Sequence, residues 1–187
     1  MFPAVFLDRD GVLIENRSDY VRDWSQVSIF SDSPAALSNL RNAGYKIVIV
    51  TNQSAVGRGL ITLETAEEIN RRLVECIRRD GGHIDAVYMC PHQPQDDCDC
   101  RKPKPGLLLR AAEDLSLDLR RSWLIGDAWS DLLAGRAANV RRTILVKTGR
   151  GNGELLQAKP GEIETYLVSD TISAAAEIVI AENHIAG

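Results

Sequence analysis

The sequence predicts an α/β fold in which a parallel β-sheet carries helices on both faces. Short apolar segments rich in β-branched residues alternate with longer segments whose apolar residues recur at helical spacing. Because parallel strands are joined by crossovers, a helix between successive strands is what such a sheet requires. With 187 residues and 44% hydrophobic content, the chain can form one good core, so we expect a single domain over residues 1–187.

The expected elements follow each other in regular order. Strands are expected at 4–7, 45–52, 84–90, 122–127, 142–147 and 165–170. Helices are expected at 33–43, 62–80, 106–115, 130–138 and 171–182. Ser33 is the predicted cap of the first helix and Thr62 or Thr65 that of the second, in which Cys76 is expected to lie in the core. The glycine-rich stretch 149–161 is predicted to be a surface loop.

The charge balance and the lengths of the apolar segments argue against several classes of protein. A formal net charge of -4 and a pI near 5.4 provide no general attraction to nucleic acid or to an anionic membrane. No apolar run approaches the roughly 20 residues of a membrane span, and the first residues do not resemble a secretion signal. We therefore expect a cytoplasmic protein with no nucleic-acid or membrane partner, and a monomer by default.

Two aspartates, Asp8 and Asp10, follow the first expected strand in the segment F-L-D-R-D-G. Carboxylates this close repel each other and need a cation or a proton between them, although a solvated turn is an equally ordinary setting for Asp and Gly. Polar residues also follow the other expected strands: Thr51, Asn52, Arg101, Lys102, Asp127 and Asp131. Because ligands bind at the carboxyl edge of such sheets, this set suits a magnesium ion and a phosphate.

Four motifs in order, D-R-D-G, T-N, R-K-P and G-D-x-x-x-D, resemble those of the haloacid dehalogenase superfamily of phosphohydrolases. The resemblance implies a three-layer Rossmann-like fold, and the chain is too short for a large cap domain. It also implies that Asp8 is the nucleophile that becomes an aspartyl phosphate, and that Asp10 is the general acid and then the base. A carboxylate suits the first role, because it is ionised at neutral pH without help from a base. Thr51 and Lys102 would contact the transferring phosphoryl group.

The same resemblance implies how magnesium is held. Its ligands would be the carboxylates of Asp8 and Asp127 and the backbone carbonyl of Asp10, and Asp131 would hold a metal-bound water. Magnesium prefers such oxygen ligands, so the donor set is chemically suitable.

A second metal site is predicted in the loop at about 90–104. Cys90, His92, Cys98 and Cys100 fall within eleven residues. Three thiolates and an imidazole suit a closed tetrahedral Zn²⁺ site with a structural role, in a reducing compartment. Free thiols beside an incidental histidine are the alternative.

The C-x-H and C-x-C-R-K-P pattern of this loop is similar to that of a capless branch of the superfamily, the heptose 1,7-bisphosphate 7-phosphatases and the histidinol-phosphate phosphatases. T-N-Q-S and G-R-G favour the heptose enzymes. The resemblance implies a small phosphorylated sugar as substrate, in the synthesis of lipopolysaccharide or other surface glycans. The expected substrate-binding residues are Asn16, Arg17, Ser18, Asp19, Tyr20, Asn52, Gln53, Ser54, Arg58 and Arg101.

Other functions stay open at this point. Histidinol phosphate would need a carboxylate near its ammonium group, which Glu15 or Asp19 could supply, whereas a second phosphate would need basic residues such as Arg17, Arg58 and Arg101. A DNA-end phosphatase shares the aspartate motif, but the acidic chain has no evident basic stripe. A non-enzymatic binding protein on this fold would be expected to lack one of the two aspartates, and both are present.

Overall fold

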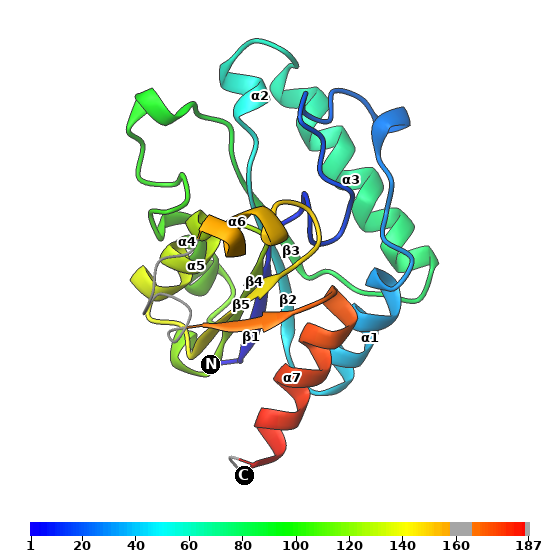
Figure 1. The fold of residues 1–187 in the computed structure, drawn as a ribbon, viewed down its shortest axis with the longest axis vertical. Coiled ribbons are helices and arrows are strands. Elements are labelled where there is room, and N and C mark those ends of the chain that lie inside the picture. The colour runs from blue at the N-terminus through cyan, green and yellow to red at the C-terminus, as the bar shows by residue number, and fades with distance from the viewer. Residues whose placement is uncertain (158–165, 186–187) are drawn as a thin grey trace.

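The computed structural model describes residues 1–157 and 166–185 and has three layers, with a parallel sheet between two layers of helices (Figure 1). The sheet has six strands in the order β3-β2-β1-β4-β5-β6. They are β1 (Ala4–Leu7), β2 (Lys46–Asn52), β3 (Ala86–Cys90), β4 (Trp123–Gly126), β5 (Arg142–Val146) and β6 (Leu167–Ser169). All neighbouring strands run parallel, which confirms the predicted fold class.

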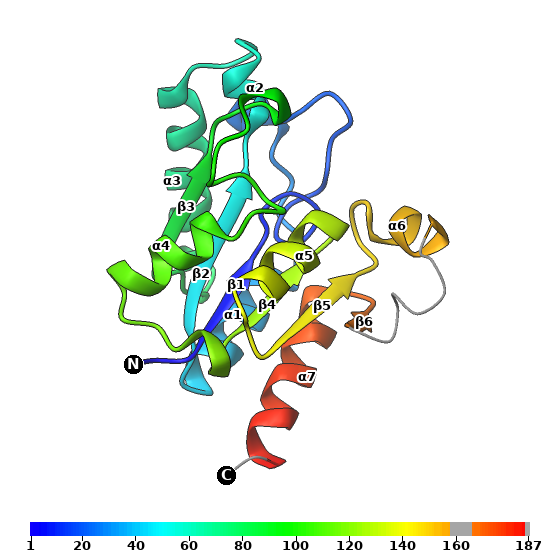
Figure 2. The same cartoon turned by 90° about the vertical axis from the view of Figure 1, so that its left-hand side faces the viewer.

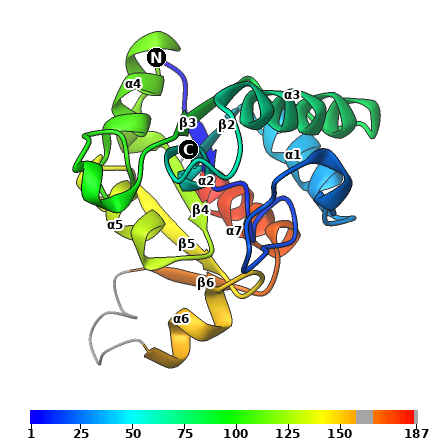
Figure 3. The ribbon, with the colours of Figure 1, turned by 90° about the horizontal axis from the view of Figure 1, so that it is seen from above.

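Helices connect the strands and cover both faces of the sheet. They are α1 (Ser33–Asn42), α2 (Ser54–Gly57), α3 (Leu63–Arg79), α4 (Gly106–Asp114), α5 (Trp129–Ala137), α6 (Gly151–Gln157) and α7 (Ile172–Ile185). Figure 3 shows α4 and α5 on one side of the sheet and α1 and α3 on the other. Within the described residues, no helix combines the length and the apolar character that a membrane span requires.

The central strand β1 explains how two cores form around one sheet. Its side chains alternate, so that Val5 and Leu7 pack with the helices α1, α3 and α7, whereas Ala4 and Phe6 pack with α4 and α5. All four are fully buried. A strand covered on both faces needs apolar residues at every position, which is why this segment reads as a continuous apolar run.

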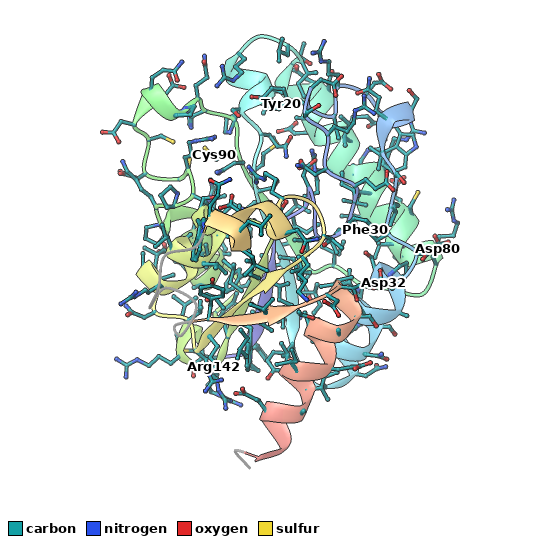
Figure 4. All side chains as sticks on the ribbon, viewed as in Figure 1. Tyr20, Phe30, Asp32, Asp80, Cys90 and Arg142 are labelled. Atoms are coloured by element: carbon teal, nitrogen blue, oxygen red, sulfur yellow. The ribbon has the colours of Figure 1, made fainter. Side chains whose placement is uncertain are left out.

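The register of the strands brings the polar residues that follow them to one edge. Leu7 lies opposite Ile49 of β2 and Ile125 of β4, so these three strands end close together. Figure 2 shows the strand arrows pointing toward the end of the molecule where α2 lies. In Figure 4, Tyr20 and Cys90 lie in this upper half, whereas Arg142, at the start of β5, lies at the lower end.

Two of the connections over this carboxyl edge are loops without an α-helix. The connection between β1 and α1 holds one short 3-10 turn, Trp24–Gln26, and a few isolated bridges. The connection between β3 and α4 holds another, Pro94–Asp96, and a third, Leu119–Arg121, precedes β4. Neither loop at the carboxyl edge forms a large cap domain, as the sequence predicted.

Three local predictions about helices are corrected. Asp32 rather than Ser33 occupies the cap position of α1, and the Ser33 hydroxyl instead donates to the carbonyl of Leu13 at 3.3 Å. Thr62 does cap α3, accepting from the Thr65 amide at 3.1 Å. Cys76 is only partly buried, because its position lies at the margin of the apolar stripe of α3.

The third correction concerns the stretch 149–161. Residues Gly151–Gln157 form α6, because Glu154 and the leucines that follow it are good helix formers. Residues 158–161 lie outside the described part of the chain. The short helix α2, directly after β2, was not predicted at all.

The packing of α1 yields a test of the fold. Leu37→Ala should lower the free energy of unfolding by about 2–5 kcal/mol, since Leu37 is fully buried between α1 and the sheet. Leu133→Ala, on the half-exposed side of α5, is the control and should change it by less than about 0.5 kcal/mol. Urea unfolding of both variants checks this, and equal midpoints would contradict the packing described here.

Candidate active site

A cleft of about 560 Å³ opens at the carboxyl edge of the sheet, above the ends of β1, β2 and β4. Most of the predicted site residues line it: Asp8, Asp10, Asn16, Arg17, Ser18, Tyr20, Asn52, Gln53, Ser54, Arg58, Arg101, Lys102 and Asp131. Of the residues predicted to bind the substrate, the phosphoryl group or magnesium, three do not. Thr51 and Asp127 are buried beneath the cleft, and Asp19 lies outside it.

Lys102 connects two of the carboxylates. Its ammonium Nζ lies 3.0 Å from Asp8 Oδ1 and 2.6 Å from Asp131 Oδ1, and it donates to the Val50 carbonyl at 2.7 Å. Burial would lower the pKa of Lys102, but the charges of Asp131 and Asp8 outweigh burial and raise it. Lys102 therefore stays charged although only 2% of it is exposed.

Three buried carboxylates converge beside this lysine. Asp8, Asp127 and Asp131 can each offer one oxygen such that these atoms all lie within 4.8 Å of one another. Burial raises the pKa of Asp8 to about 7; Lys102 opposes this, and the neighbouring carboxylates add to it. Burial and the charge of Asp131 raise the pKa of Asp127 to about 6, against the attraction of Arg150.

Three carboxylates lie here beside two cations, Lys102 and Arg150, so these side chains do not balance the negative charge of the site. A divalent cation would do so, and the available donors are all oxygens, as Mg²⁺ prefers. The residues therefore fit a magnesium ion held by Asp8 and Asp127, with Asp131 beside it.

The turn between β5 and α6 contacts the Asp127 carboxylate through Arg150. The Arg150 backbone amide donates to Asp127 Oδ2 at 2.8 Å, and the guanidinium Nη2 lies 3.4 Å from Oδ1. Gly11 and Gly149 have positive φ angles of 84° and 57°, and a Cβ on either would overlap Asp127 Oδ2. The glycine of the D-R-D-G motif is thus required by both its backbone angle and the closeness of this carboxylate.

Asp10 is bound on the side of the cleft that faces α3. Its carboxylate accepts hydrogen bonds from Arg9 and from Gln53, and the Gln53 amide also donates to Thr51 Oγ1 at 2.9 Å. The Asn52 side chain forms two hydrogen bonds with the backbone of Lys102: it accepts from the amide at 3.1 Å and donates to the carbonyl at 3.0 Å. The end of β2 therefore fixes both Asp10 and the loop that carries the lysine.

The predicted zinc ligands gather at the end of β3. Cys90 Sγ lies 3.6 Å from both His92 Nδ1 and Cys98 Sγ, and Cys100 Sγ lies 3.3 Å from His92 Nδ1 and 3.4 Å from Cys98 Sγ. Ligands about 2.0–2.3 Å from one tetrahedral zinc ion would be about 3.3–3.8 Å apart. The geometry fits the predicted zinc site, and the ion would close the loop that carries Arg101 and Lys102.

Basic residues lie on the outer part of the cleft. Arg101 donates to the His92 carbonyl at 3.1 Å, and Arg58 ends the short helix α2. Arg17 pairs with Asp19 at 3.1 Å, and both are exposed. The outer cleft therefore offers positive charge from Arg58 and Arg101, whereas the charge of Arg17 is partly offset by Asp19, which lies outside the cleft.

Five residues that line the cleft were not predicted from the sequence: Val21, Pro94, Pro103, Ser130 and Arg150. Asn70 of α3, which contacts the Arg9 side chain from beneath the cleft, was not predicted either. Arg150 lies in the glycine-rich stretch 149–161, which was predicted only to be a surface loop. Nothing in the sequence around Asn70 indicates its contact with Arg9, because a single polar residue in a long helix is ordinary and its partner is 61 positions away.

Comparisons with known proteins agree with this geometry. A model of the HAD-hydrolase-like family matches residues 99–175. The chain is 37% identical over 176 residues to a D-glycero-beta-D-manno-heptose-1,7-bisphosphate 7-phosphatase of Pseudomonas aeruginosa, covering 94% of this chain and 97% of the relative. The enzyme of the same name from Pasteurella multocida is 39% identical over 156 residues, covering 80% and 84%.

Solved structures give the same result. The D,D-heptose 1,7-bisphosphate phosphatase of B. bronchiseptica, complexed with magnesium and phosphate, superimposes with a TM-score of 0.89 at 34% identity, covering 96% of this chain and 99% of that one. The enzyme from Burkholderia thailandensis gives 0.73 at 29% identity, with the same coverage. The family predicted from the four motifs is thereby confirmed: the chain belongs to the HAD-like phosphatases, in the family of the D-glycero-beta-D-manno-heptose-1,7-bisphosphate 7-phosphatases.

Proposed function

We propose that this chain removes the 7-phosphate of D-glycero-D-manno-heptose 1,7-bisphosphate, a step toward nucleotide-activated heptose for lipopolysaccharide or other surface glycans. The observation that carries the proposal is the position of Asp8. It lies beside Lys102, Asp127 and Asp131 in a cleft whose outer part is basic. The relatives named above act on this bisphosphate, according to their names.

The reaction follows from the side chains in two steps. An Asp8 oxygen forms a bond to phosphorus while the bond from phosphorus to the sugar oxygen breaks, and Asp10 gives a proton to that oxygen. Water then attacks phosphorus, Asp10 takes its proton, and phosphate leaves with Asp8 restored. Magnesium bound at Asp8, Asp127 and the Asp10 carbonyl would neutralise charge on the phosphoryl oxygens.

Two other residues support this chemistry. Lys102 lies close enough to Asp8 to contact the phosphoryl oxygens, and its charge lowers the pKa of Asp8 against the effect of burial. Thr51 is held beneath the cleft by Gln53, and we propose that it also binds the phosphoryl group. Its burial makes this role dependent on how deeply the phosphate enters.

The second phosphate of the substrate favours the heptose over histidinol phosphate. Arg17, Arg58 and Arg101 line the cleft, and a guanidinium binds phosphate through paired hydrogen bonds. Of the carboxylates considered for histidinol phosphate, Asp19 is paired with Arg17, and Glu15 does not line the cleft. We infer that Asn16, Ser18, Tyr20 and Ser54, which also line it, contact the sugar.

We further propose that residues 1–187 form one phosphatase domain that works as a monomer in the cytoplasm. Large exposed apolar side chains in the described residues are spread over several elements, which favours a monomer. The cytoplasm is where a charged sugar phosphate is made and used, and the acidic chain favours neither nucleic acid nor membrane as a partner.

Asp8→Asn should reduce turnover at least about 10³-fold without lowering the midpoint of unfolding, because the amide matches the carboxylate in shape but cannot form the acyl phosphate. Phosphate release from heptose 1,7-bisphosphate with magnesium measures the loss. Asp80→Asn, at the exposed end of α3, is the control and should leave activity unchanged. Turnover of Asp8→Asn near the wild-type level would remove Asp8 from its role.

Cys98→Ser should lose zinc and most of the activity, because Arg101 and Lys102 belong to the loop that the metal closes. Metal analysis should find about one zinc per chain in the wild type. Cys76→Ser is the matched control, since this cysteine of α3 is not part of the four-ligand group. Full activity of a zinc-free Cys98→Ser enzyme would refute the link between metal and site.

Arg101→Ala should lower kcat/KM for the bisphosphate about 10- to 100-fold and affect a neutral aryl phosphate much less, because only the bisphosphate carries a second anion. Both anomers of heptose 1,7-bisphosphate, fructose 1,6-bisphosphate and histidinol phosphate should be compared, with zinc content checked. Arg136→Ala, exposed on α5 away from the cleft, should change nothing. A wild type that prefers histidinol phosphate would overturn the heptose assignment and leave the aspartate chemistry in place.

A further inference from the structure

Arg9, the residue between the two aspartates, is buried beneath the cleft rather than exposed to solvent. Only 1% of its surface is exposed. Its side chain forms a hydrogen bond with each oxygen of the Asp10 carboxylate: Nε donates to Oδ2 at 3.0 Å and Nη2 donates to Oδ1 at 3.1 Å. A buried guanidinium needs its positive charge compensated by a nearby negative group. A carboxylate that accepts two hydrogen bonds from one guanidinium also has a defined orientation.

Two further side chains complete the arrangement. Gln53 accepts from Arg9 Nη2 at 2.9 Å and donates to Asp10 Oδ2 at 2.8 Å, so it contacts both members of the pair. Asn70 of α3 accepts from Arg9 Nη1 at 2.8 Å. We call Arg9, Gln53 and Asn70 the Asp10 cradle.

The cradle spans three elements of the fold. Arg9 follows β1, Gln53 follows β2, and Asn70 lies in α3 on one face of the sheet (Figure 3). Asn70 does not line the cleft, so substrate does not contact it there. Its bond to Nη1 fixes the guanidinium from the side opposite the carboxylate, which leaves Nε and Nη2 facing Asp10.

We propose that Arg9 is a positioning residue for Asp10, and that Asn70 keeps Nε and Nη2 of Arg9 facing the Asp10 carboxylate. The inference rests on the proposed function, in which Asp10 delivers a proton to the leaving oxygen. Proton transfer needs the acid within hydrogen-bond reach of that oxygen, so an Asp10 side chain free to change rotamer would be a poorer acid.

The leaving group distinguishes this role from a merely structural one. A sugar oxygen must be protonated as it departs, whereas p-nitrophenolate is stable as an anion and needs little help. The quantity to compare is kcat/KM, which covers the steps up to departure of the leaving group and excludes the later attack of water. The useful number is therefore the ratio of kcat/KM for heptose 1,7-bisphosphate to kcat/KM for p-nitrophenyl phosphate.

Four variants of the full-length, metal-loaded enzyme test the cradle. Asn70→Leu removes the acceptor for Arg9, and Asn70→Asp keeps an acceptor at nearly the same place. Arg9→Lys keeps the charge but cannot form the paired bonds. Met89→Leu is the matched control, because the only other described contact of the Asn70 side chain is from Nδ2 to the Met89 sulfur at 3.5 Å.

We expect the ratio to fall about tenfold in Asn70→Leu and at least as far in Arg9→Lys, as part of the effect of general acid catalysis is lost. It should recover in Asn70→Asp and stay at the wild-type value in Met89→Leu. Unfolding midpoints of all variants show whether a lower activity comes from unfolded enzyme or from a misoriented Asp10 side chain in folded enzyme. If Asn70→Leu does not fold, the comparison of Arg9→Lys with the wild type decides.

Asp10→Asn provides the reference for these outcomes. If it lowers the ratio while Asn70→Leu and Arg9→Lys leave it unchanged, the positioning role is wrong and the proposed function stands. If Asp10→Asn itself lowers both values of kcat/KM equally, Asp10 is not the acid for the leaving group, and the positioning role falls with it. Equal losses for both substrates in Asn70→Leu would also overturn the inference.

Discussion

The structure depends on one electrostatic constraint, the gathering of buried carboxylates at the carboxyl edge of the sheet. Asp8, Asp127 and Asp131 come together there, and Lys102 is the buried cation that contacts two of them. Lys102 and the nearby Arg150 provide two positive charges beside these three carboxylates, so negative charge is left uncompensated. Such an arrangement costs stability in the protein alone, and it becomes favourable only when a cation and a phosphate complete it.

The loop at 90–104, with its predicted zinc site, serves to position Lys102. Lys102 must reach a buried position from a loop that has few apolar residues to hold it, and a lysine side chain is flexible. Two features restrict that freedom. One is the group of four side chains from Cys90 to Cys100, whose geometry fits a metal ion, and the other is the pair of hydrogen bonds between Asn52 and the Lys102 backbone. Order that a core supplies elsewhere is supplied here by a metal site and by the end of a neighbouring strand.

Sequence alone predicted the sheet, most helices and most of the side chains that line the cleft, because each of these has a local signature. Apolar runs mark the strands, and short polar motifs mark their ends, as Asp8 and Asp127 do. Features that depend on distant partners were not predictable. Ser33 turned out to bond Leu13 rather than cap its helix. The helix α6 is a different case: its residues are good helix formers, but the glycines among them suggested a loop. Asn70 could be placed only once α3 was seen to pack beside Arg9.

This difference between local and distant signals has a physical cause that bears on how the enzyme works. A nucleophile must sit at a strand end, so its position is fixed by the backbone next to it. A group that shuttles a proton must also be oriented, and orientation of a side chain is set by what surrounds it in space. In the proposed mechanism Asp10 is such a group. It is held by Arg9 of its own loop and by Gln53 after β2, while Asn70 of α3 acts on it through Arg9. The identity of the catalytic groups is local information, whereas their precision is a property of the whole α/β fold.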